Sequence, residues 1–232
     1  MANETGDRRA SLESVLATAI ATQLKEVHTM LPGQIINFDP IEQLADIQPQ
    51  LKRNVDGALK NLPVLSKVPI RFFKSGDFTI TMPLKEGDEV AIYFIERSID
   101  NWLEQGGIQS PNDTRRFDLS DAYAVPVLYS QKQKITDFDP DNMVIKSTNG
   151  NAKITLKTDG TILMETTGNT EITSAETIIN NNLTVNGDID ATGKITAPTI
   201  EGSSSLLASG AEVVDHVHGG VTTGGSNTSP LV

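Results

Sequence analysis

The sequence contains no cysteine, which excludes both a disulfide framework and a thiolate metal site. Basic residues are also scarce: 19 Lys and Arg face 30 Asp and Glu, so the formal net charge is -11 at pH 7. This balance opposes the phosphate neutralisation that dominates nucleic-acid affinity, and we expect no nucleic-acid partner. No run approaches the roughly 18 apolar residues of a membrane span, and the polar start from Met1 to Arg9 lacks the apolar segment of a signal peptide. We therefore expect a soluble chain without an export signal.

Aromatic residues are absent from the last 94 residues, because all eleven Phe, Tyr and Trp lie at or before Phe138. Aromatic side chains bury the largest area per residue, so the first part of the chain can build an ordinary globular core and the second part cannot. About half of the residues from 141 onward are Gly, Ser, Thr or Asn. The composition thus divides the chain near Asp137–Asp141.

Residues 10–31 have the spacing of an amphipathic helix, with apolar side chains at i, i+3, i+4 and i+7. Pro32-Gly33 predicts the end of this helix. His28 lies beside the apolar stripe, one turn after Leu24, where a structural role is expected. The stripe consists of Leu12, Val15, Leu16, Ala19, Ile20, Leu24, Val27 and Leu31.

Short apolar runs separated by Gly and Pro then predict five or six strands, at 34–38, 45–47, 64–70, 78–82, 90–95 and 122–128. Phe78, Ile80 and Met82 alternate, which predicts a strand with one buried face, whereas residues 90–95 are continuously apolar and predict a central strand. This number of strands in about 100 residues fits an oligonucleotide/oligosaccharide-binding (OB) barrel. Residues 1–140 hold 15 Lys and Arg against 20 Asp and Glu, so the barrel is acidic and we expect it to dock on protein.

Arg115, Arg116, Asp118 and Asp121 are the one group in this region that resembles a catalytic cluster. No apolar pocket signal sets off a carboxylate pair, and the sequence lacks both Gly-x-Ser-x-Gly and a phosphate-binding loop. We therefore expect a local ion-pair network or a subunit contact, and no catalytic or cofactor-binding residues.

Residues 141–215 contain apolar residues in short alternating pulses, separated by turn residues such as Asn149-Gly150 and Asp159-Gly160. Each pulse can bury one or two aliphatic side chains, about 2–5 kcal/mol, whereas ordering some eight residues costs on the order of 10 kcal/mol. Three copies wound about one axis would cover one another's apolar stripe and pair one another's strand edges. We therefore expect a homotrimeric β-solenoid or intertwined β-prism and not a disordered linker. The pulses are Ile154 with Leu156, Ile162 with Met164, Ile172, Ile178, Leu183 with Val185, Ile189, Ile195 and Ile200.

His216-Val217-His218 closes this polar stretch, shortly after Gly202-Ser203-Ser204-Ser205. In an extended strand His216 and His218 share one face, about 7 Å apart. Three such strands on a threefold axis would supply six imidazoles in an octahedral cage, which favours ferrous iron or nickel because zinc prefers four ligands. Two exposed histidines in a tail are the alternative interpretation.

Several motifs resemble one family, the central spike proteins of contractile-tailed bacteriophages, of the cell-puncturing, baseplate assembly V-like type. The most specific motif runs from Arg116 to Tyr123, where the family more often has His at the position of Phe117; this difference removes one candidate site histidine. The resemblance covers residues from about 10 to 135 and includes the terminal His-x-His. The other matching motifs are Leu51-Lys52-Arg53, Leu62-Pro63-Val64-Leu65 with Val68-Pro69, Gly87-Asp88-x-Val90 and Glu96-Arg97-Ser98-Ile99-Asp100-x-Trp102.

The resemblance implies a mainly β fold in four segments: an N-terminal helical segment (1–33), an OB-fold barrel docking domain (34–138), a trimeric β-helix shaft (139–210) and a metal-binding tip (211–232). It points to iron as the ion, one per trimer, with nickel and zinc as alternatives. It implies a non-enzymatic virion protein at the tip of the tail baseplate. Its partners would be the baseplate hub, the tail tube proteins and the host outer membrane, which the spike pierces when the tail contracts.

Two other functions fit the sequence less well than the spike. A receptor-binding tail fibre or carbohydrate-binding module predicts exposed aromatic residues along the shaft for stacking on sugars, and residues 139–232 contain none. A spike that carries a muramidase needs an inserted domain with a carboxylate pair, for which the chain has no room between barrel and shaft.

Overall fold

The computed structural model describes residues 11–55, 57–203, 206–208 and 211–212. The chain divides into two compact units, Met1–Thr170 and Glu171–Val232. The first unit contains the helices and nearly all of the strands, so the described part of the chain is mainly β, as expected.

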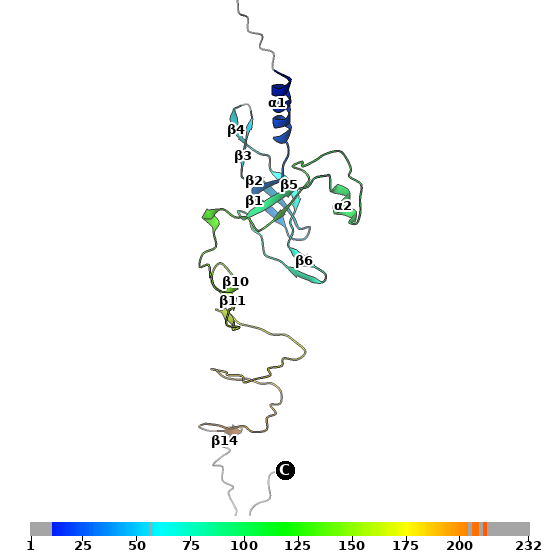
Figure 1. Ribbon diagram of the computed structural model, residues 1–232. Coiled ribbons are helices and arrows are strands. Elements are labelled where there is room, and N and C mark those ends of the chain that lie inside the picture. The colour runs from blue at the N-terminus through cyan, green and yellow to red at the C-terminus, as the bar shows by residue number, and fades with distance from the viewer. Residues whose placement is uncertain (1–10, 56, 204–205, 209–210, 213–232) are drawn as a thin grey trace, which may run out of the picture. The chain divides into compact units, whose positions relative to one another are not determined.

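The centre of the first unit is a five-stranded sheet in the order β5-β2-β1-β8-β9 (Figure 1). All neighbouring strands in this sheet are antiparallel. The strands are β1 (Met30–Asp39), β2 (Leu44–Pro49), β5 (Leu65–Pro69), β8 (Glu89–Phe94) and β9 (Ala122–Val125). They confirm five of the six strands that the sequence predicts, and the sixth, at 78–82, is found as β7 (Phe78–Ile80) of a separate hairpin.

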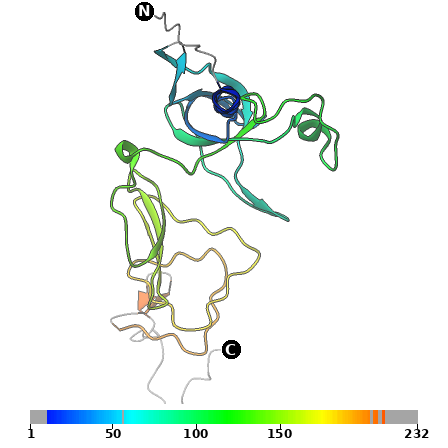
Figure 2. The same ribbon diagram turned by 45° about the horizontal axis from the view of Figure 1, so that its top comes forward.

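The two edges of the sheet meet at Ile70, directly after β5. Ile70 forms a parallel bridge with Ala124 of β9, and the Arg71 N–H donates to the Ala124 carbonyl at 2.9 Å. Because this single bridge joins the two edges at one end only, the sheet is curled into a half-barrel. Figure 2 shows the curl obliquely, with the top of Figure 1 turned toward the viewer.

The interior of the half-barrel is aliphatic. Its largest fully buried side chains alternate along the central strands, as a sheet with one inner face requires. They include Ile35, Ile47, Ile70, Val90 and Ile92. The continuously apolar run 90–95 is an interior strand, β8, with β1 and β9 on its two sides.

The helix α1 (Leu12–Leu24) is shorter than the sequence predicts. The Ser11 side chain caps its start by accepting a hydrogen bond from the Ser14 N–H at 3.2 Å. The expected continuation to Leu31 is wrong, because Met30 begins β1, where pairing with both β2 and β8 satisfies the backbone. No residue of α1 is buried.

Smaller elements extend from the half-barrel. Two hairpins and a short helix lie between its strands, and a single turn of 3-10 helix follows β9. The hairpins are β3 (Lys52–Val55) with β4 (Ala58–Asn61) and β6 (Phe73–Ser75) with β7 (Phe78–Ile80); the helices are α2 (Asp100–Gln105) and η1 (Gln131–Gln133). The expected buried face of residues 78–82 is wrong: Phe78, Ile80 and Met82 are all exposed.

A three-stranded antiparallel sheet completes the first unit. It consists of β10 (Met143–Lys146), β11 (Ala152–Leu156) and β12 (Ile162–Thr166). The first two apolar pulses of the sequence lie on β11 and β12, with Ile154 opposite Met164 and Leu156 opposite Ile162.

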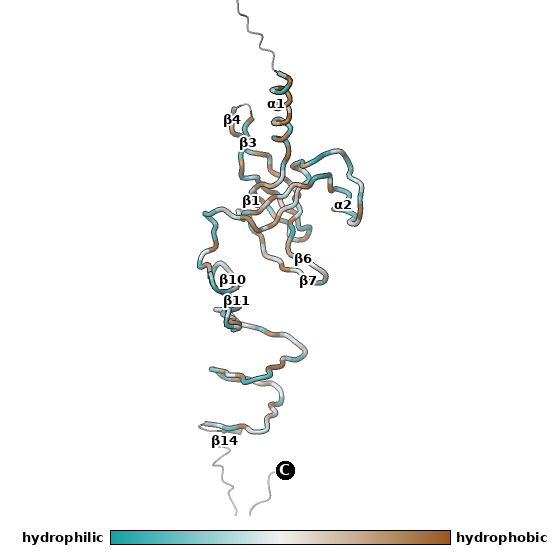
Figure 3. Tube along the Cα trace, in the orientation of Figure 1, coloured by the Kyte–Doolittle hydropathy of each residue, from teal (hydrophilic) through white to brown (hydrophobic). Residues whose placement is uncertain are grey.

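The second unit has little regular structure. Residues 171–203 contain no helix or strand, and every side chain in this range is exposed. Beyond it, β13 (Leu207–Ala208) pairs with β14 (Ala211–Glu212). Figure 3 shows apolar residues recurring along this stretch between polar ones.

Gly33 of β1 has no room for a side chain, and this tight packing gives the first prediction. A Cβ at this position would lie 2.6 Å from both Ile47 Cγ2 and Ile92 Cδ1, well inside van der Waals contact. We expect Gly33→Ala to lower the free energy of unfolding by about 1–3 kcal/mol, since overpacking forces neighbouring side chains to shift. Urea denaturation followed by tryptophan fluorescence measures this.

The control is Gly168→Ala, where a Cβ would meet only Thr166 Oγ1 at 3.8 Å. Equal stability of the two variants would show that the interior around Gly33 has room for a methyl group.

Candidate functional site

One face of the β10–β12 sheet is apolar and open to solvent. The strand register places two cross-strand rows on it: Met143, Leu156 and Ile162 form one, and Ile145, Ile154 and Met164 form the other. All of these side chains except Ile154 are exposed. An apolar sheet face of this kind marks a binding surface.

The apolar pulses of the second unit are also uncovered. Each is at least 44% exposed, and none belongs to a strand. They are Ile172, Ile178, Leu183, Val185, Ile189, Ile195 and Ile200, together with Ile179. The sequence identified most of these residues and missed Met143 and Ile145, although these two alternate in the same manner.

The β10–β12 face and the exposed aliphatic residues of the second unit share one property. They can bury aliphatic side chains against a partner and offer unpaired backbone N–H and C=O groups to its strands. They carry no aromatic side chain on which a sugar or base could stack. The arrangement is therefore suited to association with another β-rich chain.

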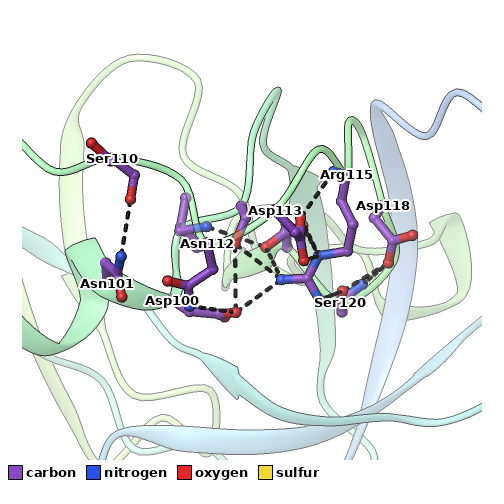
Figure 4. A network of polar contacts seen from close by, with 11 residues as sticks. Asp100, Asn101, Ser110, Asn112, Asp113, Arg115, Asp118 and Ser120 are labelled. Atoms are coloured by element: carbon purple, nitrogen blue, oxygen red, sulfur yellow. Dashed lines mark hydrogen bonds and ion pairs between the residues drawn. The ribbon is translucent and has the colours of Figure 1, made fainter.

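The predicted ion-pair network exists and is centred on Arg115 (Figure 4). Its guanidinium donates to Asp100 Oδ2 at 2.9 Å and lies 2.9 Å from Asp113 Oδ2. It also donates to the hydroxyls of Ser98 and Ser120, at 3.0 and 3.1 Å. Arg115 thus holds together the ends of a long segment, from residue 98 to residue 120.

Asp121 is the fully buried member of this network. Its Oδ1 accepts a hydrogen bond from the Ile99 N–H at 3.2 Å, and its Oδ2 lies 3.4 Å from Arg115 Nε. Burial raises the pKa of Asp121, against the opposing effects of the Ile99 hydrogen bond and of Arg115. Because the carboxylate has no exposed surface, it cannot contact a substrate in this conformation.

Asp118 and Arg116 lie at the outside of the same loop. Hydrogen bonds from the Ser120 N–H and hydroxyl hold the pKa of Asp118 below its usual value. Arg116 is exposed and forms no ion pair with the residues that the structure describes. The four residues that resembled a catalytic cluster are therefore a buried carboxylate with its counter-ion, a loop-capping carboxylate and a surface arginine.

His28 has the structural role expected of it. Its ring lies 5.5 Å from the Phe94 ring, and its backbone N–H donates to the Phe117 carbonyl at 3.3 Å. Burial, followed by the charge of Arg53, lowers its pKa. Phe117 itself has φ 50°, a left-handed conformation that is uncommon for aromatic residues.

The predicted metal ligands His216 and His218 lie outside the described residues, so the iron site stays a prediction. Within the described ranges, no group of three or more His, Cys, Asp or Glu side chains is placed to hold a metal ion. The same residues include no helix that is long and apolar enough to cross a membrane.

The half-barrel is similar to a known protein family. Residues 31–127 match the family model described as Phage protein Gp138 N-terminal domain. The matched range begins in β1 and ends two residues after β9, so it coincides with the curled sheet and its hairpins. No curated protein matches the chain significantly. The match supports a phage structural protein with a tail-related role, a component of the virion.

Arg115 gives the second prediction. Arg115→Ala leaves the buried Asp121 carboxylate without a cation, so we expect it to lower the free energy of unfolding by about 2 kcal/mol at pH 7. This is less than for a fully buried pair, because a third of the Arg115 side chain is exposed. The loss should shrink as pH falls, since the Asp121 pKa lies above its unfolded value of 3.8 and protonation removes the unpaired charge.

Denaturant unfolding at pH 7 and at pH 4 measures both effects. The neighbouring Arg116→Ala is the matched control and should change stability by less than about 0.5 kcal/mol. If the two alanine variants are equally stable, or if the Arg115 deficit grows in acid, the ion pair does not hold this loop.

Proposed function

We propose that this protein is the central spike of a contractile phage tail, a non-enzymatic homotrimer located at the tip of the baseplate. In this proposal residues 34–138 dock on the hub and tail tube proteins, and residues 139–210 form a triple-stranded β-helical shaft. Residues 211–232 form a metal-bound tip that pierces the host outer membrane when the tail contracts. The family match supports the phage structural role, and the remaining statements are inferences from the residues.

The observation that carries the proposal is the uncovered apolar series of residues 143–200. A single chain exposes nearly all of these aliphatic side chains, and in residues 171–203 it forms no strand at all. Full burial of a Leu, Ile or Met side chain stabilises by about 1.5–3 kcal/mol, so covering the whole series would greatly stabilise the folded state. Aliphatic residues spaced at short intervals over some 60 residues are best covered by identical, parallel copies of the same segment.

Threefold association would also pair the backbone groups at strand edges that a single chain leaves open. The strand edges of β10 and β12, and the backbone of 171–203, have few inter-strand partners in one chain. Three intertwined copies would pair each edge with a neighbouring chain and leave no open edge along the shaft. A shaft built in this way cannot yield in one chain without breaking the pairing of all three, which suits a part that transmits a contractile force.

The strand order of the half-barrel supports docking through an OB fold. Numbered by their order in the chain, the five strands are arranged 3-2-1-4-5, and the parallel bridge from Ile70 to Ala124 joins the third to the fifth. This order and closure are those of the five-stranded OB barrel. Because the barrel region is acidic, a protein hub is a better partner than nucleic acid.

The tip is proposed to be closed by His216 and His218 from all three chains. Six neutral imidazoles suit one octahedral ferrous ion, which would supply a cross-link where three strand ends would otherwise fray. With six protein ligands the ion would have a structural and not a catalytic role.

The third prediction concerns mass and metal content. Light scattering of the purified protein should give about 75 kDa, three times the 25.0 kDa of one chain, and elemental analysis should find one iron per three chains. The paired variant His216→Ala/His218→Ala should lose the iron and melt at a lower temperature while it remains trimeric. A metal-free monomer of wild-type sequence would refute the proposed function.

The fourth prediction separates a trimeric shaft from an isolated chain. Ile189 is 69% exposed in the single chain, so Ile189→Ser should be nearly silent if the chain acts alone. In the trimer three buried isoleucines are lost at once, and we expect the midpoint of thermal unfolding to fall by several degrees. Differential scanning calorimetry of the full chain measures this.

The matched control is Asp190→Ser, which introduces the same residue at the adjacent position, on the opposite face of an extended segment. A trimer whose unfolding is equally affected by the two substitutions would contradict the expected burial of the isoleucine series.

A further inference from the structure

The β6–β7 hairpin presents an apolar face that no other segment covers within the described part of the chain. Its register pairs Phe73 with Ile80 and Ser75 with Phe78, so these four side chains share one face. Lys74 and Thr79 share the other face. Phe78 is 83% exposed and Phe73 67%, which is unusual for aromatic residues on a hairpin with a polar second face.

The tip of this hairpin has a defined composition. Gly76 and Asp77 form a two-residue turn between β6 and β7, and Gly76 has φ 54°, as such tight turns require at their first position. An acidic and an aromatic side chain, Asp77 and Phe78, therefore stand next to each other at the end of a short, well-defined arm. The arm projects from the half-barrel in Figures 1 and 2.

A pocket of complementary composition lies at the base of the same hairpin. Its volume is about 170 Å3, and its lining is almost entirely apolar. A cavity of about 150 Å3 with aliphatic and aromatic walls accepts a benzene molecule, so this pocket has room for one phenyl ring. It is lined by Arg71, Phe72, Phe73, Met82, Val125, Pro126 and Val127.

Arg71 adds an unmatched charge to this pocket. Its guanidinium donates to the Ile70 carbonyl at 3.2 Å and forms no ion pair within the described ranges. Burial lowers its pKa, and no carboxylate opposes this effect. A partly buried guanidinium beside apolar walls is best satisfied by a carboxylate or by the face of an aromatic ring. The hairpin tip carries both groups.

We propose that the hairpin tip of one copy of this chain docks in the Arg71 pocket of the next copy, with Phe78 among the apolar side chains and Asp77 paired with Arg71. The chain does not satisfy itself in this way, because Phe78 is exposed although the pocket is part of the same barrel. The contact joins two different surfaces, so it is head-to-tail, and three such contacts close a ring. This inference rests on the proposed homotrimer and specifies how its barrels are joined.

Cysteine cross-linking tests the contact. Because the chain has no native cysteine, any disulfide must join the introduced thiols. The full-length variant Phe78→Cys/Val127→Cys is treated with diamide, which oxidises two thiols to one disulfide, and is run on a denaturing gel without reductant. We expect covalent dimers and trimers that reductant reverses. The control Thr79→Cys/Val127→Cys places the first thiol on the opposite hairpin face and should cross-link at least about tenfold less.

Charge reversal provides a second measurement on the cross-linking variant. Arg71→Glu or Asp77→Arg alone should slow disulfide formation about fivefold, a factor typical of a partly exposed ion pair, and the two together should restore the rate. Rescue by the double reversal would also show that the Arg71→Glu chain is folded, since a second substitution at the hairpin tip could not restore a misfolded barrel.

The outcomes distinguish the contact from the trimer. If the wild-type protein is a trimer but the two introduced thiols of Phe78→Cys/Val127→Cys stay reduced, or if the double reversal gives no rescue, the hairpin contact is overturned and the proposed shaft is left intact. A wild-type monomer overturns both.

Discussion

From Met143 onward the aliphatic side chains lack cover in a single chain, and this is the constraint on which the proposed assembly depends. The half-barrel satisfies its own apolar residues around Ile35, Ile47 and Ile92, so the first unit has a core. From Met143 onward the apolar residues recur at short intervals and almost all are exposed. In the proposed trimer such a segment gains its rigidity from the other chains, because the entropy cost of ordering each short stretch exceeds the free energy gained by burying its own one or two aliphatic side chains.

The elements that extend from the half-barrel differ in how they are held in place. The segment that includes α2 is held to the barrel through Arg115 and the buried Asp121, which fixes a loop that has little apolar surface of its own. The β6–β7 hairpin and α1 have no such attachment and expose apolar faces instead. A protein that assembles around a threefold axis would use these projecting elements for contacts between copies, in addition to those along the shaft.

The family match ends close to the end of the curled sheet. The match stops at residue 127, two residues after β9, and the structure beyond it changes from a curled sheet with a core to a three-stranded sheet and then to irregular chain. The absence of aromatic residues after Phe138 belongs to this second part. Both observations describe a domain similar to one in phage proteins, followed by an extension without aromatic residues.

Local pattern alone predicted the strands of the half-barrel, because period-2 alternation and turn residues are short-range signals. The compact units divide after Thr170, some 30 residues beyond the change in composition near Asp137–Asp141. The helix end was mispredicted, since Leu31 fits a helical stripe and only its pairing with Ile92 of β8 makes it a strand residue. Likewise, alternation placed Phe78 and Ile80 on a buried face, while the tertiary structure leaves them on a projecting hairpin. Burial depends on which surfaces meet, and residues far apart in sequence, such as Arg115 with Ser98 or Ile70 with Ala124, meet only in the folded chain.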